Sequence, residues 1–247
     1  MKQAFILAAG LGTRLKPLTN TMPKALVPVC GKPLLQHQIE RLLAAGFTRI
    51  VINVHHFADQ IVDFVEKYKE QHAKPHDVEF FISDEREELL ETGGALRKAT
   101  PLFLSDSPIL IHNVDILHNL DLAHFYDSHA GDATLLVSHR DTSRYLLFND
   151  DRHLVGWTNV KTGEVKPSLP SGRVEGNLLL AFSGIHILSP SLLSDMQAWP
   201  SRFSIIDFYL SVCHHSVIQG VECSSFRMVD VGKLDTLASA EDFLLNV

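Results

Sequence analysis

The chain has 247 residues, of which 45% are hydrophobic and 21% are charged. This composition excludes a disordered chain, and no apolar run approaches the ~20 residues that a membrane-spanning helix needs. The formal net charge of −7 argues against a nucleic-acid-binding protein, because a polyanion needs a positive surface. We therefore expect a single domain over residues 1–247, with neither a nucleic acid nor a membrane as its partner.

Cysteine and histidine usage argues against a disulfide framework and against a zinc site. The three cysteines are Cys30, Cys213 and Cys223. They are few and scattered, and the histidines at 55–56 and 214–215 lack the spacing of zinc ligands. The apolar run at 4–9 is short and leads into a glycine-rich loop, so we see no signal peptide. We expect reduced thiols in a cytoplasmic protein.

The first part of the chain alternates predicted strands with predicted helices. Strands are predicted at Lys2–Ala8, Arg49–Val54, Val78–Ser83 and Pro108–His112. Helices are predicted over 33–46, around Ile61–Tyr68, and at Gly93–Thr100. A long loop, 9–32, separates the first strand from the first helix. This β-loop-α-β order predicts a largely parallel sheet that is covered by helices on both faces.

The second part of the chain predicts more strands in sequence. Ala133–His139 and Tyr145–Asn149 are expected to be paired strands, and Leu178–Leu188 a long strand. Between them, 161–177 is rich in Gly, Ser and Pro and is expected to be an exposed flap. Two helices are expected at 205–213 and 234–245. The fold class is therefore α/β, with three α/β/α layers around a mixed, mostly parallel central sheet.

The loop after the first strand carries the strongest chemical pattern. Gly10 and Gly12 let backbone N–H groups converge on an anion without interference from a Cβ atom. Arg14 adds a permanent charge whose fork suits phosphate, and Lys24 adds a second cation on the same loop. This loop follows the carboxyl end of a predicted strand, where open α/β sheets bind ligands. The pattern predicts a phosphate-binding site.

Two common phosphate loops do not fit this segment. The dinucleotide-binding fingerprint requires a third glycine at position 15, which is Leu15 here. The Walker A loop requires Gly-Lys-Ser/Thr five residues after its first glycine, and neither Gly10 nor Gly12 has that sequence.

The segments 7–19, 23–29 and 31–34 together resemble the signature of the sugar-1-phosphate nucleotidyltransferases. The resemblance continues at 91–96, 113–115, 182–185 and 229–232, so it spans nearly the whole chain. It is closest to the short, single-domain uridylyltransferases that act on N-acetylmuramate 1-phosphate. The family joins a nucleoside triphosphate to a sugar 1-phosphate and releases pyrophosphate. The resemblance implies a Rossmann-like fold, with a nucleotide-binding part near 1–115 and a sugar-binding part near 116–247.

The resemblance also implies residue roles on the nucleotide side. The predicted nucleotide-binding residues are Ala8, Ala9, Gly10, Leu11, Gly12, Thr13, Arg14, Lys24, Glu91, Thr92 and Gly93. Within this set, Arg14 matches the arginine on the departing phosphates and Lys24 the lysine on the reacting α-phosphate, so these two are the predicted catalytic residues. The turn at 91–93 matches the segment that helps to read the base.

Metal and sugar residues follow from the same resemblance. Asp115 and Asp230 match the two carboxylates that hold a catalytic Mg²⁺, a cation that prefers carboxylate oxygens. The predicted substrate-binding residues are Asn113, Glu175, Asn177, Ser183 and Gly184. Val114 departs from the family, which usually has glycine before this aspartate, and a branched residue there restricts the turn.

We expect a transferase that uses UTP and a hexosamine-type sugar 1-phosphate, acting as a monomer or homodimer. Each pair of unit charges that approaches to ~4 Å repels by about 4 kcal/mol at a surface-like dielectric, so two polyanions need cations to meet. Three alternatives stay open on the sequence. CTP or GTP could be the donor; heptose phosphate, mannose 1-phosphate or phosphocholine could be the acceptor; or the chain could be a non-catalytic nucleotide-binding regulatory subunit.

Overall fold

The structure is a computed structural model that describes residues 1–72, 78–166, 174 and 176–246. Its main sheet is built from β1 (Lys2–Leu7), β4 (Phe47–Val54), β5 (Glu79–Asp84), β6 (Ile109–Asn113), β8 (Ala133–Ser138), β9 (Arg144–Phe148), β10 (Leu154–Asn159), β11 (Glu164–Lys166), β12 (Leu178–Leu188) and β13 (Ile218–Val221). Two small ribbons pair β2 (Pro28–Val29) with β3 (Lys32–Pro33), and β7 (Ile116–His118) with β14 (Met228–Asp230).

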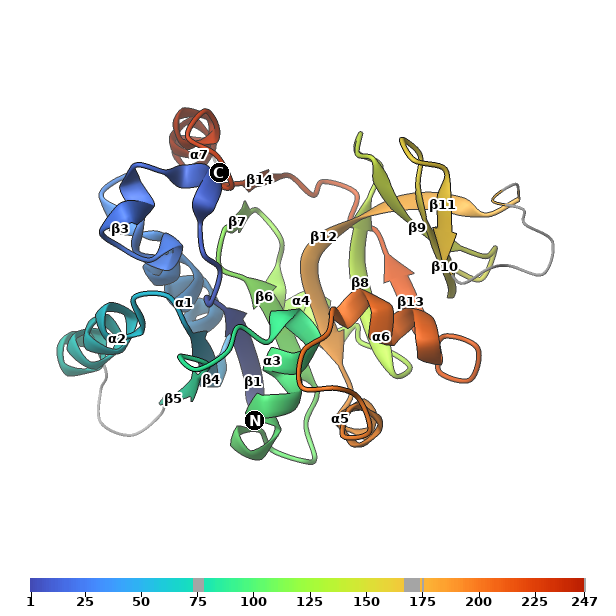
Figure 1. Cartoon of the computed structure of the whole chain (residues 1–247), viewed down its shortest axis with the longest axis horizontal. Coiled ribbons are helices and arrows are strands. Elements are labelled where there is room, and N and C mark those ends of the chain that lie inside the picture. The colour runs from blue at the N-terminus through green and yellow to red at the C-terminus, as the bar shows by residue number, and fades with distance from the viewer. Residues whose placement is uncertain (73–77, 167–173, 175, 247) are drawn as a thin grey trace.

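The helices are α1 (Leu34–Ala44), α2 (Ala58–His72), α3 (Glu91–Ala99), α4 (Leu122–Asp127), α5 (Ser191–Met196), α6 (Ile205–Val212) and α7 (Thr236–Leu245). Figure 1 shows them around a sheet whose strands run in the order β11-β10-β9-β12-β6-β1-β4-β5, with β8 added beside β12 and β13 beside β8. Within the described part of the chain, every helix is too short or too polar to cross a bilayer.

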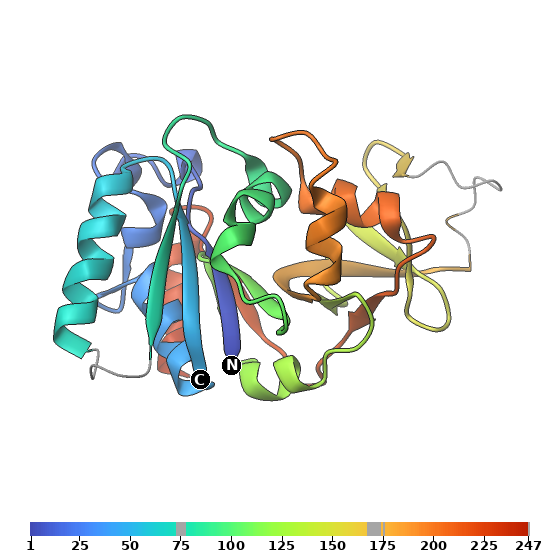
Figure 2. The ribbon, with the colours of Figure 1, turned by 90° about the horizontal axis from the view of Figure 1, so that it is seen from below.

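The sheet separates two apolar cores, one on each face. Alternate residues of β1 point to opposite faces, so Ala4 and Ile6 join one core and Phe5 joins the other. Helices α1, α2, α4 and α7 pack on the first face, and α3, α5 and α6 pack on the second, as Figure 2 shows from below. The predicted α/β fold with helices on both faces of a mixed sheet is confirmed.

The strands of the first part are parallel, as predicted. Strand β1 lies between β4 and β6, and β4 continues to β5, all in parallel pairs. The predicted loop 9–32 contains three short 3-10 turns and the hairpin β2–β3. Because parallel strands end at one edge, the segments that follow β1, β5 and β6 meet at that edge.

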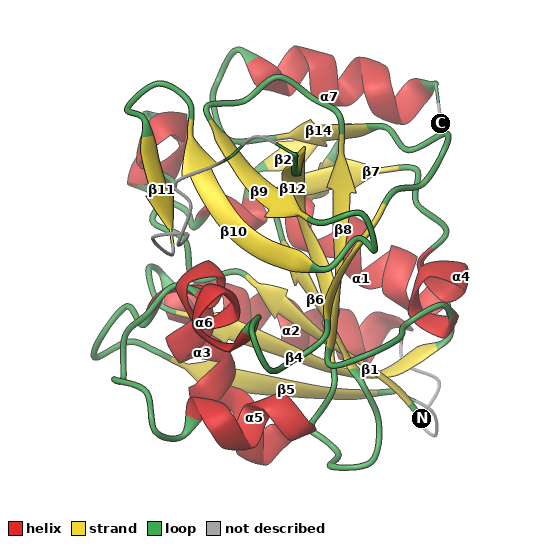
Figure 3. Ribbon diagram, turned by 90° about the vertical axis from the view of Figure 1, so that its right-hand side faces the viewer, coloured by secondary structure: helices red, strands yellow, loops and turns green. Residues whose placement is uncertain are grey.

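The predicted pairing of the strands at 133–139 and 145–149 is wrong. Strand β8 pairs with β12 and β13, whereas β9 pairs with β10 and β12, and Figure 3 shows β9 beside β10. The reason is the length of β12, which is antiparallel to both and shifts its register between Phe182 and His186. Gly184, with a φ of 76°, sits at that shift, where a residue with a Cβ would be strained.

Part of the predicted flap is a strand. Residues 164–166 form β11 and pair antiparallel with β10. Residues 167–173 and 175 lie outside the described residues, and Glu175, one of the predicted sugar-binding residues, is among them.

Candidate active site

A cavity of about 430 Å³ opens where β1, β4, β5 and β6 end. Seven residues of the predicted site line it, namely Ala9, Gly10, Lys24, Glu91, Thr92, Asn113 and Asp115. They come from four segments that are far apart in sequence, and the parallel sheet brings them to one edge. The other predicted residues that the structure describes do not line this cavity.

The glycine loop packs tightly against Lys24. Gly12 has a φ of 63°, and a Cβ there would lie 2.8 Å from the side chain of Thr19 and 3.0 Å from the Cβ of Lys24. The Thr19 hydroxyl donates to the Gly12 carbonyl at 2.8 Å, which closes the loop. Glycine is therefore required at position 12, because a side chain there would clash and the φ is positive. The close packing of the loop leaves Lys24 buried beneath it.

The two predicted metal ligands lie at the ends of two paired strands, β7 and β14. Asp115 immediately precedes β7, and Asp230 ends β14, opposite Ile116 in the antiparallel pair. The N–H of Val231 donates to the Asp115 carbonyl at 2.9 Å, which fixes the two backbones together. The Lys24 ammonium contacts the Asp115 carboxylate directly. Lys24 and Asp115 therefore meet at the edge of the cavity.

Charges gather around Asp230. Burial raises the pKa of Asp230, and the nearby Asp115 raises it further, whereas Lys24, Arg14 and Arg140 lower it. A Cβ at Gly232 would lie 2.8 Å from Asp230 Oδ1 and 3.1 Å from Arg14 Nη2. The structure thus brings Arg14, Lys24, Asp115 and Asp230 together, although they are far apart in sequence.

This cluster suits a divalent cation. Asp115 raises the pKa of Asp230, so the two carboxylates repel each other, and a bound cation relieves that repulsion. Across the described ranges, no group of three His, Cys, Asp or Glu side chains could hold a metal by itself. A pair of carboxylates can hold a hard divalent cation that keeps several waters and takes further oxygens from substrate phosphates.

The turn predicted to read the base is fastened to the chain before α6. Gly93 N–H donates to the Phe203 carbonyl at 2.9 Å, and the Thr92 hydroxyl accepts from Ile205 N–H at 3.0 Å. A Cβ at Gly93 would lie 2.3 Å from the Phe203 ring, so only glycine allows this approach. The turn is therefore held by a segment from the second part of the chain.

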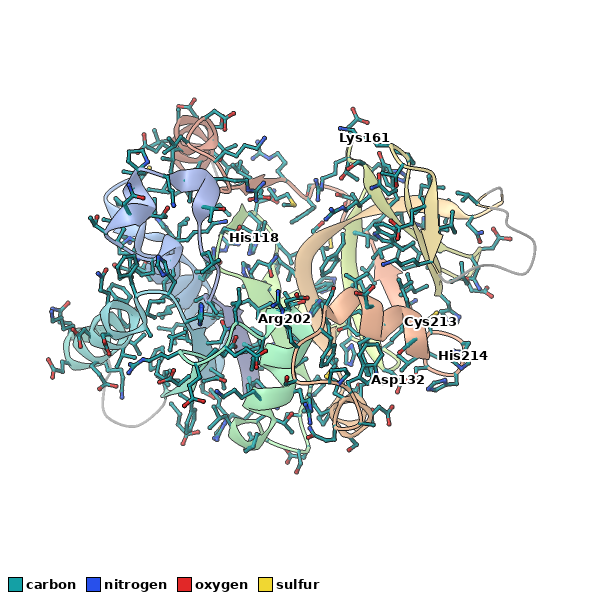
Figure 4. The ribbon with its side chains drawn as sticks, in the orientation of Figure 1. His118, Asp132, Lys161, Arg202, Cys213 and His214 are labelled. Atoms are coloured by element: carbon teal, nitrogen blue, oxygen red, sulfur yellow. The ribbon has the colours of Figure 1, made fainter. Side chains whose placement is uncertain are left out.

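Glu91 is strained and paired at the surface. It has a φ of 62°, which few residues with a Cβ adopt. Its carboxylate accepts from Arg202 Nε at 2.9 Å, and Figure 4 shows Arg202 near the start of α3. A strained residue of this kind is often found at a functional site.

A second cavity, of about 470 Å³, lies between β9, β10, β11 and α6. Three cationic side chains line it, Arg140, Arg144 and Lys166. The Lys166 ammonium lies 5.6 Å from the centre of the Trp157 ring. Ser204 lines both cavities, so the two are adjacent. Sequence reasoning placed Lys166 only in an exposed flap and assigned nothing to the two arginines.

The predicted sugar-binding residues separate into two groups. Gly184 lies against Asn113, since a Cβ at Gly184 would be 2.7 Å from Asn113 Nδ2. Ser183 is buried beside it, and its hydroxyl has no hydrogen-bond partner among the described residues. Asn177 precedes β12 and lines neither cavity.

Val114 fits the turn without a positive φ. Its side chain is buried, and its N–H donates to the Leu7 carbonyl at 3.2 Å. The departure from the family pattern therefore does not displace Asp115 from the cavity.

Sequence reasoning missed Asn53 and Glu85, which both line the first cavity. A detectable pattern was present. Asn53 is a polar residue near the carboxyl end of an apolar predicted strand, and Glu85 follows the next strand by two residues. Polar side chains at this edge of a parallel sheet are candidates for a site.

A family model described as nucleotidyl transferase matches residues 3–247. The chain belongs to this family. It is 34% identical over 232 residues to the N-acetylmuramate alpha-1-phosphate uridylyltransferase of Caulobacter vibrioides, covering 89% of this chain and 88% of the relative. It is 32% identical over 247 residues to a mannose-1-phosphate guanyltransferase of Aspergillus oryzae, covering 94% of this chain but only 61% of that protein. The predicted resemblance is confirmed.

Solved structures share the fold of this nucleotidyl transferase. HddC from Yersinia pseudotuberculosis, solved in complex with GMP-PN, aligns with a TM-score of 0.75 at 26% identity over 99% of this chain and 100% of that chain. A UDP-glucose pyrophosphorylase from Acinetobacter baumanii aligns with a TM-score of 0.74 at 17% identity over 98% of this chain and 92% of that one.

Proposed function

We propose that this protein transfers the nucleotidyl group of UTP to the phosphate of a hexosamine-type sugar 1-phosphate and releases pyrophosphate. The observation that carries the proposal is the gathering of Arg14, Lys24, Asp115 and Asp230 beside a cavity whose wall includes the glycine loop. A single-domain cytoplasmic enzyme, monomeric or homodimeric, is part of the same proposal.

The chain's own residues supply charge and position rather than a nucleophile. The sugar phosphate oxygen attacks the α-phosphorus in line with the bond to pyrophosphate. Lys24 stabilises the negative charge that grows on the α-phosphate, and Arg14 holds the departing phosphates. The loop residues 8–13 surround the triphosphate, and the backbone N–H groups of residues 10–13 bind its oxygens. Catalysis is then mainly orientation and electrostatic stabilisation.

Asp115 and Asp230 would hold a Mg²⁺ ion beside the phosphates. The ion supplies positive charge that offsets the repulsion between the two anionic substrates. The Lys24 ammonium is paired with the Asp115 carboxylate. When phosphate is present, the ammonium can exchange this carboxylate for the α-phosphate, because both are anionic oxygen acceptors.

The second cavity is the proposed binding site of the sugar 1-phosphate. It adjoins the first cavity at Ser204 and carries three cations that can bind an anionic acceptor. Trp157 offers an apolar face against which a sugar ring can pack. Asn113, Ser183 and Gly184 are the proposed contacts to the sugar from the side of β6 and β12, and the turn 91–93 is the proposed contact to the base.

GTP as the donor is the second candidate. It is supported by the guanyltransferase relative from Aspergillus oryzae and by the HddC structure with GMP-PN. The donor is decided by a pyrophosphate-release assay with UTP, GTP, CTP and ATP against a panel of hexose and hexosamine 1-phosphates, with Mg²⁺ present. We expect the largest kcat/KM with UTP and an N-acetylhexosamine 1-phosphate. Absence of turnover with every pair would contradict the proposed activity.

A further inference from the structure

The amide of Asn53 fastens the start of the glycine loop. Its Oδ1 accepts two backbone N–H groups, from Ala8 at 2.6 Å and from Ala9 at 3.2 Å. These are the first residues after β1, where the chain leaves the sheet. Only the oxygen of a side-chain amide accepts hydrogen bonds, so Oδ1 must face these two N–H groups. The Nδ2 group of Asn53 therefore faces away from them.

Glu85 receives that Nδ2 group and also holds the base-side turn. Asn53 Nδ2 donates to Glu85 Oε1 at 2.8 Å, and Leu90 N–H donates to Glu85 Oε2 at 3.3 Å. Leu90 directly precedes the turn 91–93. One continuous chain of hydrogen bonds therefore runs from the glycine loop to the turn predicted to read the base. We call this chain, through the side chains of Asn53 and Glu85, the bridge.

Both side chains are buried, at 2% exposure for Asn53 and 0% for Glu85. Burial raises the pKa of Glu85, and the hydrogen bonds from Asn53 and Leu90 lower it. A buried carboxylate costs stability compared with an apolar residue of similar volume, so packing alone does not account for it. Both residues also line the first cavity, which places this polar pair at the site rather than elsewhere in the core.

We propose that Asn53 and Glu85 are positioning residues that hold the glycine loop and the turn 91–93 at the separation required by a nucleoside triphosphate. This inference rests on the proposed function. The loop is proposed to bind the phosphates and the turn the base, so a change in their spacing weakens both contacts to the same molecule. The proposed contacts to the sugar 1-phosphate lie at neither end of the bridge.

The bridge can be tested by reversing its hydrogen bond. Asn53→Asp places two carboxylate oxygens against each other. Glu85→Gln offers one acceptor and one donor where two acceptors are needed, so it loses the bond to Asn53 or the bond to Leu90. In the double variant, Gln at 85 donates to Asp at 53 and still accepts from Leu90, and the formal charge equals that of the original pair.

We expect each single variant to raise the KM for the nucleoside triphosphate by about tenfold, with a change of less than about twofold in the KM for the sugar 1-phosphate. The double variant should return to within about threefold of the original value. Gln3→Glu is the matched control, because Gln3 is equally buried, bonds backbone groups at the opposite end of β1, and does not line the cavity. It should lower the melting temperature and leave the nucleotide KM unchanged.

Calorimetric titration of each protein with the four nucleoside triphosphates and Mg²⁺ separates this inference from the proposed reaction. If the unsubstituted protein binds a nucleotide but does not turn it over, the proposed reaction is contradicted. The bridge is then tested by the effect of each variant on the Kd for that nucleotide. Equal effects of the single variants on both substrates, an equal effect of Gln3→Glu on nucleotide affinity, or a double variant no better than the singles would overturn the bridge. An original protein that binds none of the four nucleotides would overturn it as well.

Discussion

The two parts of the molecule build their cavities in different ways. The strands β1, β4, β5 and β6 are parallel, so the segments that follow them meet at one edge of the sheet. The residues at this edge can therefore be found in the sequence directly after each predicted strand. Around β9, β10, β11 and β12 the strands are antiparallel, and the cavity is lined by strand faces. A motif can therefore identify the first cavity, whereas the second depends on strand pairing.

The largest effect is expected in the first cavity. Lys24→Ala should lower kcat/KM by about a thousandfold, because the α-phosphate loses a preorganised cation in a poorly solvated site. Thermal unfolding should change little by comparison. Pyrophosphate release and calorimetry measure the two effects on the same preparation.

Lys32→Ala is the matched control for that variant, since Lys32 is exposed and pairs with Glu40 outside the cavity. It should retain nearly full activity. Loss of cooperative unfolding in Lys24→Ala, or an equal loss of activity in both variants, would show that Lys24 serves the fold and not the reaction.

Asp230→Asn should lower activity by about a hundredfold at fixed Mg²⁺ and raise the Mg²⁺ concentration needed for half-maximal rate. Removal of one carboxylate weakens cation binding but leaves Asp115 in place. A Mg²⁺ titration of the rate measures the shift. Asp235→Asn, an exposed position before α7, is the control. An unchanged Mg²⁺ requirement in Asp230→Asn would remove Asp230 from the proposed metal site.

Lys166→Met tests the second cavity and should raise the KM for the sugar 1-phosphate by about tenfold, while the KM for the nucleotide stays within about twofold. The reason is the loss of one cation beside Trp157. Lys161→Met, on the neighbouring exposed turn labelled in Figure 4, should change neither value. If only the KM for the nucleotide rose, the second cavity would be the nucleotide site and not the sugar site.

The smallest effect concerns stability beneath the second cavity. Neither ring nitrogen of His186 has a hydrogen-bond partner in the described part of the chain, and burial lowers the pKa of His186 to about 3. The unfolded chain binds this proton below about pH 6.5 and the folded one does not, so stability falls as the pH drops from 6.5 towards 3.

His186→Phe removes that contribution and keeps a ring between Phe182 and Tyr209. We expect its melting temperature to exceed that of the original protein by a few degrees at pH 5, with a smaller gain at pH 8. Scanning calorimetry across this pH range measures the difference. A gain that does not depend on pH would show that the imidazole does not titrate on unfolding.

Much of the fold was predicted because single elements in both parts of the chain carry strong local patterns. Strand β12 was predicted with its observed ends, and the cation at 24 and the carboxylate at 115 were predicted from one signature. The pairing of β8 and β9 could not be predicted, because β12 selects their neighbours from a distance. Arg140 and Arg144 were missed for the same reason, since only the folded sheet places them near Lys166.

A crystal structure of the protein with Mg²⁺ and the nucleotide sugar formed in the assay would show where both substrates bind. We expect the α-phosphate against Lys24, the cation held by Asp115 and Asp230, and the sugar directed towards Arg140 and Lys166. A nucleotide bound away from Lys24, with Asp115 and Asp230 free of the cation, would contradict this expectation.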